Sequence, residues 1–183
     1  MDVDFYVHET AIVEDDVSIG AGTNVWHHCH VRSGARIGAD VSLGKGVFVD
    51  LGVTIGDRVR AQNHVYLPQG LEVHDDVFLG PKATFTNDVY PRAVGDWELT
   101  PTVVAQGASV GANATVVAGR DLGAYCVVGA GSVVTRPVQP FELVAGNPAR
   151  RLGWVDRAGR VVIRGDVPAP TSGDVAEWAT DHG

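Results

Sequence analysis

The amino-acid sequence predicts an all-β parallel solenoid, in which short strands stack coil upon coil. Three observations predict it: apolar residues recur at every sixth position, glycine often follows them, and the composition is rich in Val and Gly but poor in Lys. A period of six matches neither the 3.6-residue turn of a helix nor the alternation of an ordinary strand. It fits a solenoid in which six residues form one strand and one corner, so that three repeats complete a coil of about 18 residues.

The sixfold repeat begins near the N-terminus and continues for fourteen positions. These positions are Val7, Val13, Ile19, Val25, Val31, Ile37, Leu43, Val49, Ile55, Ala61, Leu67, Val73, Leu79 and Phe85. The repeat resumes with Val104, Val110, Val116, Leu122, Val128 and Val134. We expect about seven coils within residues 1–140. Cys29 and Cys126 fall at small inward positions of this pattern, so we expect them to be packing residues.

Residues 86–103 interrupt the repeat, because Phe85 and Val104 are not separated by a multiple of six. An insertion into a regular scaffold is a common place for functional residues. We therefore expect a functional loop here. Its chemically distinctive residues are Asn87, Asp88, Tyr90, Arg92 and Trp97.

Residues 141–183 are expected to form a C-terminal cap and tail. Residues 152–163 are typical of a strand, a turn and a second strand. Residues 166–183 are rich in Pro, Ser, Gly and acidic residues, with a short helix expected at about 175–180.

Charge and composition exclude several classes of protein. The net charge of −8 argues against a general nucleic-acid binder. No apolar run approaches the roughly 18 residues of a membrane span, and the first residues lack the pattern of a secretory signal. We therefore expect a cytoplasmic protein with no membrane partner. Residues 120–164 contain seven Arg and three acidic residues, which indicates either a local anion site or a solvated basic face.

Several segments resemble the hexapeptide-repeat acyltransferases, and the resemblance covers about residues 7–155. After the loop, Gln-Gly-Ala-Ser-Val-Gly-Ala-Asn-Ala-Thr (106–115), Val-Gly-Ala-Gly-Ser-Val-Val (128–134) and Ala-Gly-Asn-Pro-Ala-Arg-Arg (145–151) are similar to the acetyl-coenzyme A half of these enzymes. Before it, residues 7–13, 25–31 and 80–93 are similar to the nucleotide-linked 3-amino-sugar N-acetyltransferases. The pattern Thr-Asn-Asp-x-x-Pro-Arg (86–92) is closer to those acting on dTDP-3-amino-3,6-dideoxyhexoses than to those acting on UDP-linked 3-amino-glucuronates.

This resemblance implies a left-handed parallel β-helix that transfers acetyl from acetyl-coenzyme A to the 3-amino group of a nucleotide-linked sugar. It also implies a homotrimer with its sites between subunits, and no metal. Two alternatives remain open. One is the same fold acting on a UDP-3-amino-uronate or a small alcohol, and the other is a non-catalytic solenoid scaffold.

The candidate catalytic residues are Asn87, Asp88 and His64. The resemblance implies that Asn87 positions the sugar amine, whereas a simpler interpretation is a turn residue that caps the local backbone. Asp88 is either a base, a carboxylate that binds hydroxyl groups, or a solvated acid. The loop has no His. His64 is therefore the histidine candidate for a base or an acceptor contact.

Residues 18 apart should stack on adjacent coils, which places His28, His64 and Lys82 in one column together with Gly46. His28 and His64 would then lie two coils, or about 10 Å, apart, which is too far for one metal ion. We take His28, Lys82, Tyr90 and Arg92 as candidate acceptor-binding residues. Arg92 could hold a phosphate or pair with a neighbouring acid.

The residues for acetyl-coenzyme A follow from the resemblance alone. It implies that backbone amides at Gly107, Ala112 and Ala130 line the path of the pantetheine and the thioester. It further implies that Asn147, Pro148, Arg150 and Arg151 surround the cofactor, with Arg150 or Arg151 at its anionic end. Plain corner geometry is an alternative role for Gly107.

Overall fold

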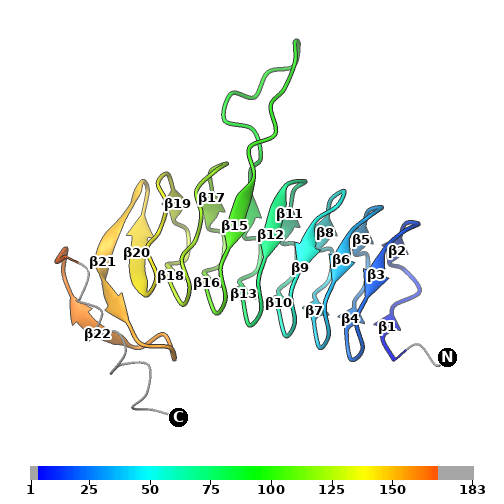
Figure 1. Ribbon diagram of the computed structural model, residues 1–183, viewed down its shortest axis with the longest axis horizontal. Coiled ribbons are helices and arrows are strands. Elements are labelled where there is room, and N and C mark those ends of the chain that lie inside the picture. The colour runs from blue at the N-terminus through cyan, green and yellow to red at the C-terminus, as the bar shows by residue number, and fades with distance from the viewer. Residues whose placement is uncertain (1–3, 169–183) are drawn as a thin grey trace.

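Each six-residue repeat folds into a two-residue strand followed by a corner, and the strands stack into three parallel sheets (Figure 1). The computed structural model describes residues 4–168. Sheet A contains β1 (Tyr6–Val7), β4 (Asn24–Val25), β7 (Ser42–Leu43), β10 (Arg60–Ala61), β13 (Phe78–Leu79), β16 (Ser109–Val110), β18 (Val127–Val128) and β20 (Glu142–Gly146). Sheet B contains β2 (Ile12–Val13), β5 (His30–Val31), β8 (Phe48–Val49), β11 (Tyr66–Leu67), β14 (Thr84–Phe85), β17 (Thr115–Val116) and β19 (Val133–Val134). Sheet C contains β3 (Ser18–Ile19), β6 (Arg36–Ile37), β9 (Thr54–Ile55), β12 (Leu71–Val73) and β15 (Thr102–Val104).

The register of these sheets follows the sequence repeat. Asn24 pairs with Ser42 and Ser42 with Arg60, which are equivalent positions of successive coils. The residues at the repeat positions point inward and form a continuous core along the axis. Leu43 and Leu67 are fully buried in it. The predicted all-β, left-handed parallel β-helix is confirmed as the fold class.

The solenoid extends further than the expected seven coils. β20, which lies in the expected cap segment, pairs in parallel with β18 and adds an eighth strand to sheet A. β21 (Ala149–Val155) then pairs antiparallel with β20, and β22 (Val161–Arg164) antiparallel with β21. These last two strands are the predicted strand–turn–strand unit. The helix expected at 175–180 lies outside the described residues.

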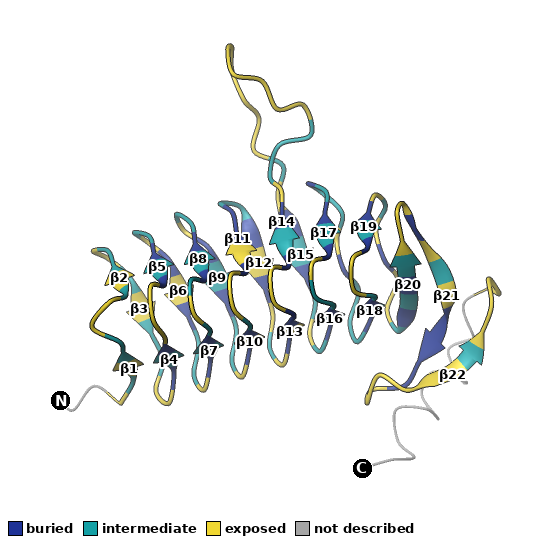
Figure 2. Ribbon diagram, turned by 180° about the vertical axis from the view of Figure 1, so that it is seen from behind, coloured by how far each residue is buried: buried dark blue, intermediate teal, exposed yellow. Residues whose placement is uncertain are grey.

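The three corners of each coil form three edges that run along the solenoid. We name them by the sheets they join. The A/B edge contains residues such as 26–29 and 62–65, the B/C edge residues such as 32–35 and 68–70, and the C/A edge residues such as 38–41 and 74–77. The inserted loop leaves the B/C edge between β14 and β15 and projects away from the solenoid (Figures 1 and 2). The described residues contain no helix that could cross a membrane.

Both cysteines are packing residues, as predicted, because Cys29 and Cys126 are almost fully buried. Burial raises the pKa of Cys29, and burial followed by the nearby Glu142 carboxylate raises the pKa of Cys126 to about 12. Because the thiolate is the reactive form, we expect almost no reaction of the two thiols with an aromatic disulfide reagent in the native protein at pH 8. The same titration in guanidinium should release two equivalents per chain. Rapid reaction of either thiol in the native protein would contradict this packing.

Candidate functional site

The A/B edge carries the column of exposed side chains that the repeat predicts. His28, His64 and Lys82 each adopt a left-handed backbone conformation with φ near +60°, and all three are exposed. Gly46 occupies the intervening coil with φ +69°. A side chain there would collide with the imidazole of His64. The structure therefore brings His28, His64 and Lys82 onto one edge, at successive heights along the solenoid.

The same edge continues upward past Ala112 and Ala130 to the turn between β20 and β21. At several other corners a side chain from the next coil caps the backbone, as when Lys45 N donates to Asn63 Oδ1 at 3.0 Å. Ala130 takes the equivalent position one coil above Ala112, and its side chain has no oxygen that could accept a hydrogen bond from Ala112 N–H. Among the described residues, the N–H groups of Ala112 and Ala130 consequently have no hydrogen-bond partner. These two amides are free to bind the carbonyl groups of a ligand.

The turn above Ala130 contains the exposed residues Asn147 and Pro148, joined by a cis peptide bond. Arg150 follows this turn and is exposed, and among the described residues its side chain donates one hydrogen bond, from Nη1 to the carbonyl of Ala149 at 3.1 Å. Arg151, unlike Arg150, is mostly buried, and its guanidinium is held by neighbouring side chains. Its Nε donates to Glu142 Oε1 at 2.7 Å, and its guanidinium lies 4.7 Å from the Trp154 ring centroid.

Gly107 does not join this group, because it lies on the C/A edge. Its N–H donates to the carbonyl of Asp75 at 3.0 Å, and its φ is +71°. A Cβ at this position would collide with the ring of Tyr125. The observed geometry favours the corner role for Gly107 over a contact with a cofactor.

The neck of the inserted loop forms on the B/C edge, around Asn87. Asn87 is half-buried, and its Nδ2 donates to the carbonyl of Gln69 at 3.2 Å. Its own carbonyl accepts from Thr100 N at 2.8 Å, which closes the neck. The Asn87 side chain therefore caps the local backbone, and its Oδ1 remains available as an acceptor.

The other loop candidates lie beyond this neck, where Asp88 is half-buried and Tyr90 and Arg92 are exposed. Asp88 Oδ1 accepts from Tyr90 N at 2.7 Å, a local turn. Tyr90 is 79% exposed. Arg92 is exposed and donates to the carbonyl of Pro91. Within one chain, Asn87 and His64 lie at opposite ends of the sheet B strands and do not meet.

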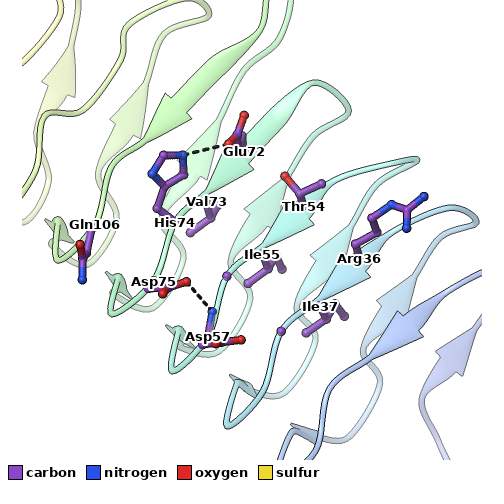
Figure 3. A pocket seen from close by; sticks show the side chains of 12 residues that line it. Arg36, Ile37, Thr54, Ile55, Asp57, Glu72, Val73, His74, Asp75 and Gln106 are labelled. Atoms are coloured by element: carbon purple, nitrogen blue, oxygen red, sulfur yellow. Dashed lines mark hydrogen bonds and ion pairs between the residues drawn. The ribbon is translucent and has the colours of Figure 1, made fainter.

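Sequence reasoning missed a groove on sheet C, which has a volume of about 550 Å³ (Figure 3). It crosses β6, β9 and β12 and reaches the C/A edge. At one end the His74 Nε2 and the Glu72 Oε1 lie 2.9 Å apart. The sequence held a signal for this pair, because Glu72 lies on β12 and His74 directly follows it, and residues two apart in an extended segment share one face. The described residues contain no cluster able to hold a metal ion.

The sixfold repeat and the parallel β-helix are similar to those of hexapeptide-repeat proteins. Residues 34–68 and 101–136 match the family model described as the hexapeptide repeat of succinyl-transferase. This chain is also 56% identical to a dTDP-3-amino-3,6-dideoxy-α-D-galactopyranose 3-N-acetyltransferase of Aneurinibacillus thermoaerophilus, over 54 residues, or 30% of this chain. The chain spans less than a third of the length of the curated relatives it matches, 28% in this case.

Two solved structures share the fold. A hexapeptide-repeat-containing acetyltransferase of Vibrio cholerae, complexed with acetyl-coenzyme A, is 26% identical with a TM-score of 0.54, over 67% of this chain and 72% of that one. The N-acyltransferase AntD of Bacillus cereus, a mutant in complex with dTDP and coenzyme A, superposes with a TM-score of 0.59 over 84% of both chains. Its identity is 14%, so this second likeness concerns the fold alone.

Proposed function

We propose that this chain is an N-acetyltransferase that moves acetyl from acetyl-coenzyme A to the 3-amino group of a nucleotide-linked deoxyamino sugar. The acceptor class we infer is a dTDP-3-amino-3,6-dideoxyhexose. The observation that carries the proposal is the 56% identity, over 54 residues, to an enzyme with this named activity. It is supported by a regular solenoid that offers two free amides on one edge and an insertion on another.

Acetyl transfer to an amine requires a bound thioester, donors for the developing oxyanion and a neutral amine held in line. The free N–H groups of Ala112 and Ala130 are suited to the carbonyl groups of pantetheine. Asn147 and Pro148 would border this path. Arg150 extends into solvent above them and is suited to a phosphate. Arg151 is already occupied by Glu142, so we assign the anion contact to Arg150.

On the acceptor side, Asn87 Oδ1 is suited to receive a hydrogen bond from the sugar amine, because Nδ2 is already fixed to Gln69. Tyr90 and Arg92 on the loop would contact the nucleotide or the sugar. Asp88 holds the turn that presents them and keeps a free carboxylate oxygen for a hydroxyl group.

The A/B edge and the loop lie on opposite sides of sheet B, so one chain does not complete this site. We propose a homotrimer in which the loop of one copy meets the A/B edge of the next. In that assembly His28, His64 and Lys82 would face the acceptor held by the neighbouring loop. His64 could then accept the amine proton. We place the enzyme in the cytoplasm, together with its two proposed substrates.

Coenzyme A release, followed with a thiol reagent, tests the proposal on a small acceptor panel. The panel contains dTDP-3-amino-3,6-dideoxygalactose, its glucose epimer and a UDP-3-amino-glucuronate. We expect turnover with one of the dTDP sugars. Turnover with the UDP sugar alone would indicate that the acceptor is a UDP-3-amino-uronate. Binding of acetyl-coenzyme A without any turnover would refute the acceptor, and no binding at all would favour a scaffold.

Arg150→Ala tests the donor side. We expect the KM for acetyl-coenzyme A to rise about tenfold, because a charge-assisted hydrogen bond to phosphate is worth about 1.5–3 kcal/mol. The urea midpoint should stay unchanged, since the Arg150 side chain is exposed and its one hydrogen bond within residues 4–168 goes to the neighbouring carbonyl of Ala149. Steady-state kinetics against acetyl-coenzyme A measure the effect, with Arg164→Ala on β22 as the exposed control. An unaltered KM would remove Arg150 from the site.

A further inference from the structure

A column of hydrogen-bonded and ion-paired residues runs along the B/C edge, from the first coil of the solenoid to the neck of the inserted loop. Successive members lie 18 or 19 residues apart, and they are Glu14, Arg32, Asp50, Gln69 and Asn87. Arg32 bridges the first members, because its Nε lies 3.6 Å from Glu14 Oε1 and its Nη1 donates to Asp50 Oδ1 at 2.9 Å. The column therefore provides a physical connection that reaches Asn87 from the N-terminal coils.

Asp50 is the member of the column whose carboxylate fixes the backbone at Gln69. Its side chain is 15% exposed. Oδ1 accepts from Arg32 Nη1 and, at 2.8 Å, from Leu51 N, whereas Oδ2 accepts from Gln69 N at 3.3 Å. The two donors on Oδ1 hold the carboxylate in one orientation, so Oδ2 remains directed at the next coil and anchors the N–H of Gln69.

Gln69 in turn fixes the side-chain amide of Asn87. The Gln69 N–H is held by the coil on its N-terminal side, and its carbonyl accepts from Asn87 Nδ2 at 3.2 Å on the coil that follows. An asparagine amide carries its donor and its acceptor on opposite sides, so a hydrogen bond at Nδ2 also decides where Oδ1 points. Asn87 Oδ1 is the atom that we assign to the sugar amine.

We propose that Asp50 is a positioning residue for acetyl transfer and acts on Asn87 through the backbone of Gln69. The inference rests on the proposed function and deepens it, because it names the group that keeps Oδ1, rather than Nδ2, directed at the amine. An amine that donates to Oδ1 keeps its lone pair for the thioester carbonyl, whereas an amine that accepts from Nδ2 has that lone pair occupied. Without the Asp50 carboxylate, the Gln69 N–H loses its acceptor, and the Asn87 amide loses its fixed orientation.

Asp57 provides a matched comparison, because it caps a corner in the same way on another edge. Its Oδ1 accepts from Ala39 N at 2.8 Å on the C/A edge. Both carboxylates therefore satisfy a corner N–H of a neighbouring coil, which is a structural role. Asp50 differs from Asp57 in that the N–H it holds belongs to the residue that binds Asn87.

Steady-state kinetics with dTDP-3-amino-3,6-dideoxygalactose test the inference by a double-mutant cycle. Asp50→Ala should lower kcat/KM for the sugar about tenfold, the effect of one misplaced hydrogen bond, and leave the KM for acetyl-coenzyme A unchanged. In the Asn87→Ala background the same change should have no further effect, because Asp50 acts through the Asn87 amide. Asp57→Ala should leave both parameters at their wild-type values.

Asp50→Asn tests the same idea with little change in shape. Its single oxygen should turn toward Arg32 and Leu51 N, which supply two donors, and its amide nitrogen then faces Gln69 N and offers no acceptor. We therefore expect the kinetic defect of Asp50→Ala in a variant that keeps the volume of the side chain.

Nuclear magnetic resonance of protein labelled at its asparagine side chains reports on Asn87 without any substrate. The amide signals of Asn87 are identified by their loss in Asn87→Ala. We expect both Asp50 variants to shift these signals and Asp57→Ala to leave them in place.

The two measurements separate the inference from the proposed function. If both Asp50 variants leave the Asn87 signals and the sugar kinetics unchanged while the wild-type protein acetylates the sugar, the inference is overturned and the proposed function stands. An equal loss from Asp50→Ala with and without the Asn87 side chain would also overturn the inference, because Asp50 would then act on its own. If the wild-type protein acetylates no 3-amino sugar, the proposed function fails, and a shift of the Asn87 signals would still show that Asp50 orients Asn87.

Discussion

Deletion of residues 88–100 is expected to leave the solenoid folded and to reduce acetyl transfer at least about 100-fold. The register beneath the loop explains why the fold survives. Phe85 pairs with Val116 across the loop, whereas Ser42 pairs with Arg60 in an ordinary coil. The deletion makes the distance along the chain from Phe85 to Val116 equal to that from Ser42 to Arg60. It shortens the connection from β12 to β15 by the same number of residues. Activity should fall because positioning of reactants commonly contributes several orders of magnitude to rate.

The deletion variant is measured by circular dichroism, by urea unfolding and by coenzyme A release. Its urea midpoint should change little, because Tyr90, Val94 and Trp97 are exposed and bury nothing in the core. A point variant within the loop, Val94→Ser, is the control for general disturbance of the loop. A folded deletion variant with more than a tenth of wild-type turnover would show that the site does not use the loop.

Glu142→Ala is expected to lower the free energy of unfolding by about 3 kcal/mol, the largest stability effect we anticipate from a single polar residue. The Glu142 side chain is fully buried at the C-terminal end of the solenoid. It accepts hydrogen bonds from Arg136 Nη2 and Arg151 Nε, both at 2.7 Å, and from Gln139 N at 2.8 Å. Removal of the carboxylate leaves a buried void, deprives Arg136 of its ion-pair partner and leaves Arg151 paired only with the exposed Asp166 among the described residues.

The effect of Glu142 should depend on pH. Burial by itself would raise its pKa, but hydrogen bonds from Arg136, Gln139 N–H and Arg151 outweigh burial and lower it from the ordinary value of 4.5. The unfolded state thus binds more protons in this range, so the stabilisation is complete above pH 4.5 and is lost as the pH falls through the folded value.

Urea unfolding between pH 7 and pH 3 measures this dependence. The gap between the wild-type protein and Glu142→Gln should be widest at neutral pH and narrow on acidification. Asp166→Asn is the matched control, because Asp166 is 84% exposed and lies 3.5 Å from Arg151. A constant gap across this pH range would mean that the Glu142 charge does not stabilise the fold.

The sequence alone was sufficient to predict the fold, because three six-residue repeats span the same 18 residues that separate hydrogen-bonded partners in successive coils. Leu43 pairs with Val25 in the coil before it and with Ala61 in the coil after it, so counting along the repeat places it in the core. Counting the sixfold repeat underestimated the number of coils only at the C-terminal end of the solenoid. The coil that leads to β20 is shorter than the regular coils, as the pairing of Val128 with Val144 shows, and the last strand therefore falls out of the sixfold pattern.

The site was less predictable, because periodicity does not say which polar groups are already paired. Adjacent Arg150 and Arg151 are equivalent in sequence, yet Glu142 occupies one of them and leaves the other free. Gly107 and Ala112 are close in sequence, yet β16 separates them onto different edges.

The groove at sheet C was beyond sequence reasoning for a different reason. The pair of Glu72 and His74 is visible as two polar residues two positions apart at the end of β12. The space beside it depends on the missing side chains of Gly38 and Gly56, which only the stacked coils bring into one column.

The central claim is N-acetylation of an amino sugar, and transfer of radiolabelled acetyl from acetyl-coenzyme A to dTDP-3-amino-3,6-dideoxygalactose tests it most directly. The account predicts label on the nucleotide sugar in a form that resists neutral hydroxylamine, as an amide does. Label that hydroxylamine removes would indicate an ester and a hydroxyl acceptor. Label that stays on coenzyme A with every 3-amino sugar offered would contradict the account.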